Sequence, residues 1–265
     1  MRLKKYLGQH LLVAEPTLEK IVRTLAPAEN DTVLEIGPGD GRLTAHLLKC
    51  GCRVIAVEKD AEMIESLNVR LGDAKNLKII HADFLKLDLT YALKHLNTYA
   101  LFCGNIPYNI SSPILFKLRD NRHLFDRGML TIQKEVAERL IGKPGSKNYG
   151  ILAIMMQSAA KIERCFDISP RSFIPPPKVT SSVIKLTFPE EPPYNIEDKE
   201  LFSAIVKKAF GQRRKMIRNS LPSEYLPALE AAGIEPSRRP ETVSIEEFAR
   251  LASNLTLCLS IQRNS

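Results

Sequence analysis

Residues 103–110, Cys-Gly-Asn-Ile-Pro-Tyr-Asn-Ile, contain the residue types best suited to chemistry in this chain. Asn105 offers both donor and acceptor atoms, the carbonyl before Pro107 has a tightly set direction, and Tyr108 adds a flat face for a nucleobase. Such a group can accept both hydrogens of an exocyclic amine and hold its nitrogen in line with an electrophile. The alternative is an ordinary strand-to-loop turn, and these residues alone do not decide between the two.

Four apolar segments predict strands that would position this group and its neighbours. They lie at residues 32–36, 53–57, 77–80 and 100–102, and helical patterns separate the first three. Residue types that bind ligands follow each segment directly, as expected at the carboxyl edge of a doubly wound sheet. This convergence is the strongest functional signal in the sequence.

A glycine-rich loop with Gly37, Gly39 and Gly41 follows the first predicted strand. Such a turn lets a ligand approach the backbone closely and opens a Rossmann-type unit. The spacing is Gly-x-Gly-x-Gly rather than the Gly-x-Gly-x-x-Gly of dinucleotide sites, which favours a smaller nucleoside ligand. The same spacing, with no acid suited to hydride transfer, disfavours an NAD-type oxidoreductase.

Acidic and aromatic residues after the next two strands fit a nucleoside. Glu58 ends the second strand about 20 residues past the glycines, where an acid can accept from both ribose hydroxyls. The alternative for Glu58 is a helix-capping acid, since a helical pattern follows. Asp83 and Phe84 end the third strand and could hold an adenine by its amino group and its face. Phe173, beside a proline-rich loop, is a core side chain or a base-stacking platform, and the residues alone favour the core.

Composition limits the partners that this chain can have. Its 265 residues carry a formal charge of +8, which points to a polyanionic partner. The five cysteines show neither disulfide nor metal-ligand spacing, so we expect no metal site and a reducing cytoplasm. No segment is long and apolar enough to span a membrane. Residues 1–6 are basic without a following apolar core, so we expect no signal peptide, and a solvated terminus is favoured there over a nucleic-acid contact.

The sequence predicts two domains joined by a linker. Residues 1–188 form the ligand-binding domain, residues 189–199 form a linker rich in proline and acids, and residues 200–265 form a small helical domain. Between residues 207 and 218 the helical domain has several cations and no acid. A solvated face usually mixes signs, so this cluster favours contact with phosphates. Its members are Lys207, Lys208, Arg213, Arg214, Lys215 and Arg218.

Seven motifs occur in order along nearly the whole chain. They lie at residues 9–12 (Gln-His-Leu-Leu), 35–41 (Glu-Ile-Gly-Pro-Gly-Asp-Gly), 57–60 (Val-Glu-Lys-Asp), 82–84 (Ala-Asp-Phe), 104–109 (Gly-Asn-Ile-Pro-Tyr-Asn), 173–179 (Phe-Ile-Pro-Pro-Pro-Lys-Val) and 211–215 (Gly-Gln-Arg-Arg-Lys). Together they resemble the ribosomal RNA adenine dimethyltransferases, and most closely the bacterial small-subunit members of that family. Asn-Ile-Pro-Tyr is specific to amino-group methyltransferases, and its combination with Gly-Gln-Arg-Arg-Lys is specific to this family.

The resemblance implies an α/β fold, with a Rossmann-like class I methyltransferase sheet and a small all-α C-terminal domain. It implies S-adenosylmethionine as cofactor, and the motif positions indicate most of the residues that would contact it. Gly39 in the glycine loop and Phe84 after the third strand are added to these. The expected contacts are His10, Leu12, Gly37, Gly39, Glu58, Asp83, Phe84 and Asn105. Two residues depart from the family pattern in the N-terminal motif, where Leu11 replaces its usual Phe and Ala14 its usual Asp.

The implied product is N6,N6-dimethyladenosine at two adjacent adenosines in the terminal hairpin of small-subunit (16S) ribosomal RNA, within the immature 30S particle. We expect a cytoplasmic monomer with no membrane partner. Tyr108 and, by resemblance, Phe173 would sandwich a flipped-out base. Asn105 and the carbonyl of Ile106 or Pro107 would accept both amino hydrogens, so that no general base is needed.

Two other functions remain open on the sequence. In one, the protein is an RNA-binding assembly factor whose occupancy of the immature subunit matters more than methylation. In the other, it is a large-subunit enzyme of the kind that confers macrolide resistance, which shares most of the motifs. The match through the C-terminal part argues against this second alternative.

Overall fold

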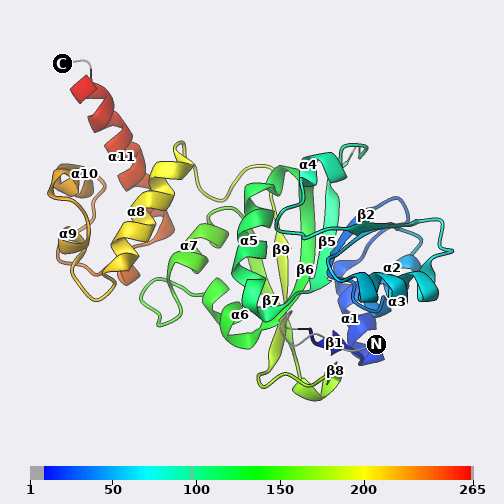
Figure 1. Cartoon of the computed structure of the whole chain (residues 1–265). Coiled ribbons are helices and arrows are strands. Elements are labelled where there is room, and N and C mark those ends of the chain that lie inside the picture. The colour runs from blue at the N-terminus through cyan, green and yellow to red at the C-terminus, as the bar shows by residue number, and fades with distance from the viewer. Residues whose placement is uncertain (1–8, 97, 264–265) are drawn as a thin grey trace. The chain divides into compact units, whose positions relative to one another are not determined.

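The computed structural model describes residues 9–96 and 98–263, so the expectation for residues 1–6 lies outside the described part of the chain (Figure 1). The chain divides into two compact units. The sheet unit consists of residues up to 137 and residues 161–190, and the helical unit consists of residues 138–160 and 191–265.

The sheet unit is built on a seven-stranded sheet in the order β4-β3-β2-β5-β6-β9-β7. The strands are β2 (Thr32–Ile36), β3 (Arg53–Glu58), β4 (Leu77–His81), β5 (Ala100–Asn105), β6 (Phe125–Gln133), β7 (Lys161–Ile168) and β9 (Ser181–Thr187). Strands β4, β3, β2, β5 and β6 are parallel to one another, whereas β9 pairs antiparallel with both β6 and β7. The four predicted strands and the doubly wound arrangement are confirmed. Strand order reverses between β2 and β5, which is where such sheets bind ligands.

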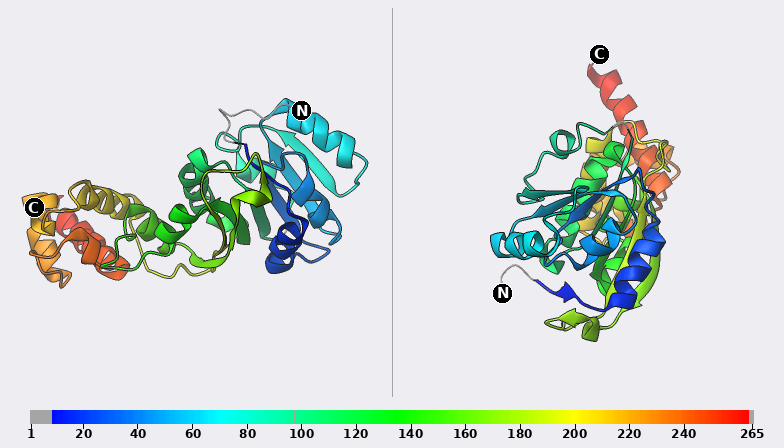
Figure 2. Two further views of the ribbon diagram at one scale, coloured as in Figure 1. Left: turned by 90° about the horizontal axis from the view of Figure 1, so that it is seen from below. Right: turned by 90° about the vertical axis from the view of Figure 1, so that its right-hand side faces the viewer.

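Helices lie against both faces of this sheet (Figure 2). The sheet unit contains α1 (Glu15–Leu25), α2 (Arg42–Leu48), α3 (Ala61–Leu71), α4 (Leu89–Ala92) and α5 (Ser111–Asp120), and α6 (Lys134–Leu140) begins in it and ends in the helical unit. Helix α1 shows why they form: Pro16 stands in its first turn, and its buried face carries Leu18, Ile21, Val22 and Leu25 at helical spacing. These side chains join α2, α3 and alternate strand residues in one core cluster.

A second, two-stranded sheet pairs the N-terminal arm with the proline-rich loop. Strand β1 (Leu11–Leu12) runs antiparallel to β8 (Phe173–Ile174), with Leu12 opposite Phe173. Val13 N–H extends the pairing by donating to the Ser172 carbonyl over 2.9 Å. Neither strand was predicted, because two-residue strands carry no periodicity.

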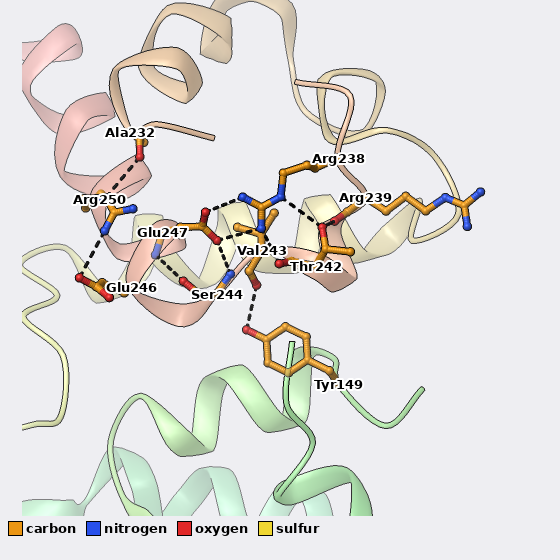
Figure 3. A network of polar contacts seen from close by, with 10 residues as sticks. All are labelled: Tyr149, Ala232, Arg238, Arg239, Thr242, Val243, Ser244, Glu246, Glu247 and Arg250. Carbon is orange, nitrogen blue, oxygen red and sulfur yellow. Dashed lines mark hydrogen bonds and ion pairs between the residues drawn. The ribbon is translucent and has the colours of Figure 1, made fainter. Parts of the chain in front are cut away.

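The helical unit contains α7 (Ile151–Gln157), α8 (Lys199–Gly211), α9 (Ile217–Ser220), α10 (Leu226–Ala231) and α11 (Ile245–Arg263). The all-α C-terminal part that the resemblance implies is confirmed. The unit boundary at Glu190 lies close to the predicted end of the first domain, but residues 138–160 differ from the expectation, since they belong to the helical unit. Tyr149 explains this: it is fully buried, its ring lies 6.2 Å from that of Phe210, and its hydroxyl donates to the Val243 carbonyl (Figure 3). An apolar sequence segment does not reveal which core it packs against.

Candidate active site

A cavity of about 560 Å³ opens at the carboxyl ends of β2, β3, β4 and β5 in the sheet unit. Its walls bring together residues that the sequence placed at four strand ends and on the N-terminal arm. The predicted residues that line it are His10, Leu12, Gly37, Gly39, Glu58, Asp83, Phe84, Asn105, Pro107 and Tyr108. The volume falls within the range typical of small-molecule sites.

The glycine loop forms one wall of this cavity together with the N-terminal arm. Gly39 and Gly41 have φ of 57° and 82°, a region that favours glycine. A Cβ at Gly39 would lie 2.8 Å from a methyl carbon of Leu11, and one at Gly41 would lie 2.5 Å from a methyl carbon of Leu67. The glycines therefore serve both the turn and the close approach of neighbouring side chains.

Glu58 joins this loop to the end of β3. Its carboxylate accepts hydrogen bonds from the backbone N–H groups of Gly39 (3.1 Å), Lys59 (2.8 Å) and Asp60 (2.9 Å). Burial raises the pKa of Glu58, and the backbone donors oppose that rise. The capping role considered for Glu58 falls to Asp60, whose side chain accepts from Glu62 N–H at the start of α3. Since a carboxylate has about four acceptor positions, Glu58 retains capacity for a ligand hydroxyl.

Asp83 and Phe84 occupy the wall beyond β4. Asp83 accepts from Lys59 Nζ over 2.9 Å and from Leu85 N–H over 3.0 Å. The hydrogen bond from Lys59 lowers the pKa of Asp83, so the group is an ionised acceptor. Phe84 is buried, with Lys117 Nζ 5.6 Å from its ring centroid. This wall offers one negative charge beside an apolar surface.

The Asn105 side chain is oriented by the arm. Its Nδ2 donates to the main-chain carbonyl of His10 over 2.6 Å. Within residues 9–96 and 98–263, no protein group is hydrogen-bonded to Oδ1 of Asn105. One donor of the amide is therefore used within the protein, whereas its acceptor oxygen is available to a ligand.

Tyr108 is held from two sides. Its hydroxyl and Ser181 Oγ lie 2.5 Å apart, and its ring stacks on that of His10 with centroids 5.6 Å apart and an interplanar angle of 24°. His10 is fixed in turn by a 2.7 Å hydrogen bond between Nδ1 and the Pro175 carbonyl. Burial raises the pKa of Tyr108, so the hydroxyl is neutral at physiological pH.

A family model described as "Ribosomal RNA adenine dimethylase" matches residues 1–257 of this chain. The chain belongs to this family. A ribosomal RNA small subunit methyltransferase A from Caldanaerobacter subterraneus subsp. tengcongensis is 41% identical over 98% of this chain and 99% of its own length. This ribosomal RNA adenine dimethylase is therefore an S-adenosylmethionine-dependent enzyme that dimethylates adenine in ribosomal RNA.

Solved structures support the same assignment. A dimethyladenosine transferase from Plasmodium falciparum superposes with a TM-score of 0.81 at 27% identity, covering 94% of this dimethylase and 98% of that chain. The 23S rRNA methyltransferase ErmE gives a TM-score of 0.69 at 26% identity, covering 93% and 99%. These neighbours bear out the class I methyltransferase fold.

Phe173 is the one predicted sheet-unit site residue that does not line the cavity. Its side chain is 2% exposed and belongs to the core cluster with Leu12, its partner across the β1–β8 pair. The Phe173 ring is thus a core side chain in this structure, as the residues alone favoured, and the base-sandwiching role implied by the resemblance stays a prediction. The ring stacked on Tyr108 is that of His10 instead.

Among the cavity-wall residues to which the sequence analysis assigned no role are Glu35 and Gln9. Glu35, within β2, is 1% exposed, and burial raises its pKa to about 8. Thr44 Oγ1 lies 2.6 Å from its carboxyl group. Gln9 Nε2 donates to Asp60 over 2.9 Å and ties the arm to the start of α3. The signal for Glu35 was an acid inside an otherwise apolar strand, whereas Gln9 stood before any periodic segment.

The predicted cations of the helical unit do not all have the same surroundings. Arg213 is half-buried and forms a 2.6 Å ion pair with Glu241, a residue far along the chain. The exposed members are Lys207, Lys208, Arg214, Lys215 and Arg218. Within the described residues, no cluster of side chains is suited to hold a metal ion, and no helix has the length and apolarity needed to cross a membrane.

Proposed function

We propose that this dimethylase methylates N6 of two adjacent adenosines in the terminal hairpin of small-subunit ribosomal RNA. The observation that carries the proposal is the orientation of Asn105, whose donor is bound by the His10 carbonyl while its acceptor oxygen remains for an amine. Tyr108, beside it, presents an aromatic ring at the same cavity. The small-subunit target is supported by the names of relatives that are more similar to this chain than the 23S enzyme is.

The cavity fits S-adenosylmethionine by size and by the chemistry of its walls. Glu58 would accept from a ribose hydroxyl, Asp83 would accept from the adenine amino group, and Phe84 would contact the adenine ring. Backbone of the loop at Gly37 and Gly39 permits close approach of the ligand. His10, Leu12 and Asn105 would close the site from the arm and from the end of β5.

When bound, S-adenosylmethionine supplies an electrophilic methyl group with a neutral leaving group. The chain must then overcome the delocalisation of the adenine amino lone pair. Asn105 Oδ1 accepts one amino hydrogen and a carbonyl beside Pro107 accepts the other, which draws the nitrogen toward a nucleophilic geometry. Positioning of this kind can supply roughly 7–11 kcal/mol of a barrier. The proton leaves to water, so no side chain acts as a general base.

We assign the second acceptor to the carbonyl of Ile106. The carbonyl of Pro107 already accepts from Ile110 N–H over 3.2 Å and from Ser111 Oγ over 3.3 Å. Pro107 acts by fixing the direction of the preceding carbonyl, since its ring restricts the residue before it. Its own φ and ψ of −59° and 134° continue the extended path that ends β5.

The proposed substrate form is the immature 30S particle, bound by a monomer in the cytoplasm, where that particle is made. Exposed cations of the helical unit support contact with ribosomal RNA phosphates. Because this cluster and the cavity belong to different compact units, occupancy of the particle and methylation can be separated. A role in subunit biogenesis beyond methylation is therefore open to test.

The decisive experiment incubates the protein with labelled S-adenosylmethionine and, in separate reactions, immature small subunits, mature small subunits or large subunits, followed by nucleoside analysis. Labelled N6,N6-dimethyladenosine at two adjacent positions supports the proposal. Label confined to mature subunits, to large-subunit RNA or to a different nucleoside contradicts it.

A further inference from the structure

Arg213 is an internal tie of the helical unit. Its Nε donates to Glu241 Oε2 over 2.6 Å, and its Nη2 donates to the carbonyls of Ser146 (3.4 Å) and Lys147 (2.9 Å). One guanidinium therefore joins three segments that are far apart in sequence. They are the loop after α8, the segment before α11, and the loop before α7.

Further contacts fix the loop at residues 142–148 to the same segment. Gly145 N–H donates to the Glu241 carbonyl over 2.7 Å, and just past the loop the Tyr149 hydroxyl donates to the Val243 carbonyl over 3.0 Å. The accepting segment is itself held to α11, since Arg238 is paired with Glu247 (Figure 3). The loop is thus built into the unit through both its backbone and its neighbour Tyr149.

The loop carries charge of one sign. Residues 142–148 read Gly-Lys-Pro-Gly-Ser-Lys-Asn, with two lysines and no acid. Lys143 and Lys147 are both exposed, as are Arg214 and Lys215, which directly follow Arg213 in the other loop. Because Arg213 binds the carbonyl of Lys147, the two loops are adjacent, and each carries exposed cations.

We propose that Lys143 and Lys147 belong to the RNA-binding surface of the helical unit, and that the Arg213–Glu241 pair positions this surface instead of contacting phosphates. Arg213 shares its charge with a carboxylate 2.6 Å away, so it contributes less to an external phosphate than an unpaired cation does. The partner is the phosphate backbone of ribosomal RNA. This inference rests on the proposed function, and it extends the predicted cluster to a loop assigned to another domain by sequence.

The first test measures binding of the full chain to immature small subunits as a function of salt. A Lys143→Ala/Lys147→Ala double variant should lower the log–log slope by about 2, since each lost phosphate contact removes about 1. Lys199→Ala, which removes an exposed cation at the other end of α8, is the matched control and should keep the wild-type slope. An unchanged slope in the double variant overturns the inference.

A comparison variant separates this outcome from failure of the proposed function. Arg214→Ala/Lys215→Ala should also lower the slope by about 2. If this variant lowers the slope and the lysine variant does not, the loop at residues 142–148 is excluded from the RNA-binding surface and the proposed function stands. If neither lowers it, the phosphate contacts proposed for Arg214 and Lys215 fail as well.

The second test distinguishes two roles of Glu241, because they predict opposite effects on RNA binding when its side chain is removed. Removal of a negative charge from a cationic surface should strengthen RNA binding if Glu241 acts only through its charge. Removal of a tie should weaken binding and speed hydrogen exchange at Gly145 N–H by about tenfold or more, the scale of losing a charge-assisted hydrogen bond. We expect Glu241→Ala to weaken binding while Glu224→Ala, at an exposed acid of the same unit, does not. Tighter binding by Glu241→Ala, in a variant with normal thermal unfolding, contradicts the positioning role.

Discussion

The Asn105 side chain donates a 2.6 Å hydrogen bond to the carbonyl of His10, a residue 95 positions earlier in the chain. The contact reaches a main-chain atom, so it does not depend on which side chain stands at position 10. It couples the orientation of the amide at the end of β5 to the placement of the N-terminal arm. The arm therefore helps to set the geometry of the site, in addition to lining the cavity.

Asn105→Ala should reduce turnover by roughly 10²-fold or more, the scale for loss of one preorganised polar contact. The fold should persist, because the side chain lies at a strand end and only half-buried. Single-turnover methylation of immature subunits measures the effect. Asn68→Ala, on the exposed face of α3, is the control, and near-normal turnover by Asn105→Ala would remove Asn105 from the mechanism.

Glu58→Ala and Asp83→Ala should each weaken binding of S-adenosylmethionine by roughly 1.5–3 kcal/mol, because each removes a charged acceptor at the cavity. Calorimetric titration gives the affinities, and Asp73→Ala serves as a control at an exposed acid. Glu58 also accepts hydrogen bonds from three backbone N–H groups, so its loss can affect folding. Thermal unfolding is therefore measured as well, and affinities are compared with wild type at the same folded fraction. Unchanged affinity in both variants would place the cofactor elsewhere.

Tyr108→Phe and Ser181→Ala should impair methylation through the same hydrogen bond. Each should lower kcat/KM by up to about tenfold, and the double variant should be no worse than either single variant. The neighbouring Ser182→Ala is the control, since its hydroxyl bonds to Asp167 instead. Additive losses in the double variant would show that the two side chains act independently.

The Glu35 carboxyl should make stability depend on pH. Its pKa is raised from 4.5 to about 8 in the folded protein, so the folded state keeps a proton that the unfolded state releases. Stability should therefore fall as pH rises from about 4.5 to about 8, by on the order of a few kcal/mol. Glu35→Gln should remove this fall. Urea unfolding across that interval measures it, and parallel curves for the two proteins would refute the assignment.

Glu58→Ala also separates catalysis from occupancy. The variant should still bind immature subunits through the helical unit but fail to methylate them. If release follows methylation, this variant should remain bound and impair subunit maturation more than deletion of the protein does. Subunit profiles of cells with either change provide the comparison. A phenotype no worse than deletion, from a variant shown to bind, leaves methylation as the only supported function.

Local patterns predicted most of the sheet unit from the sequence. Buried strands read as apolar runs, and residues after four of them converge because parallel strands end at one sheet edge. The remainder depended on contacts between distant segments. The sequence around Phe173 favours a core side chain but does not show that it packs beside Leu12, and nothing near Asn105 shows that its donor is bound by the His10 carbonyl. The same limit applies to Arg213, whose partner Glu241 lies outside the charge run that drew attention to it.

The helical unit is assembled from two separate stretches of chain, residues 138–160 and 191–265. During synthesis the first stretch leaves the ribosome before its packing partners exist, so Tyr149 can reach Phe210 only after the start of the second stretch has emerged, and Val243 only after more than half of it has. A fragment that starts at residue 200 would lack Tyr149, and its Phe210 ring would lose that neighbour. We therefore expect the helical unit to fold last, after the sheet has received β9, so that the proposed RNA-binding surface is among the final parts of the enzyme to form.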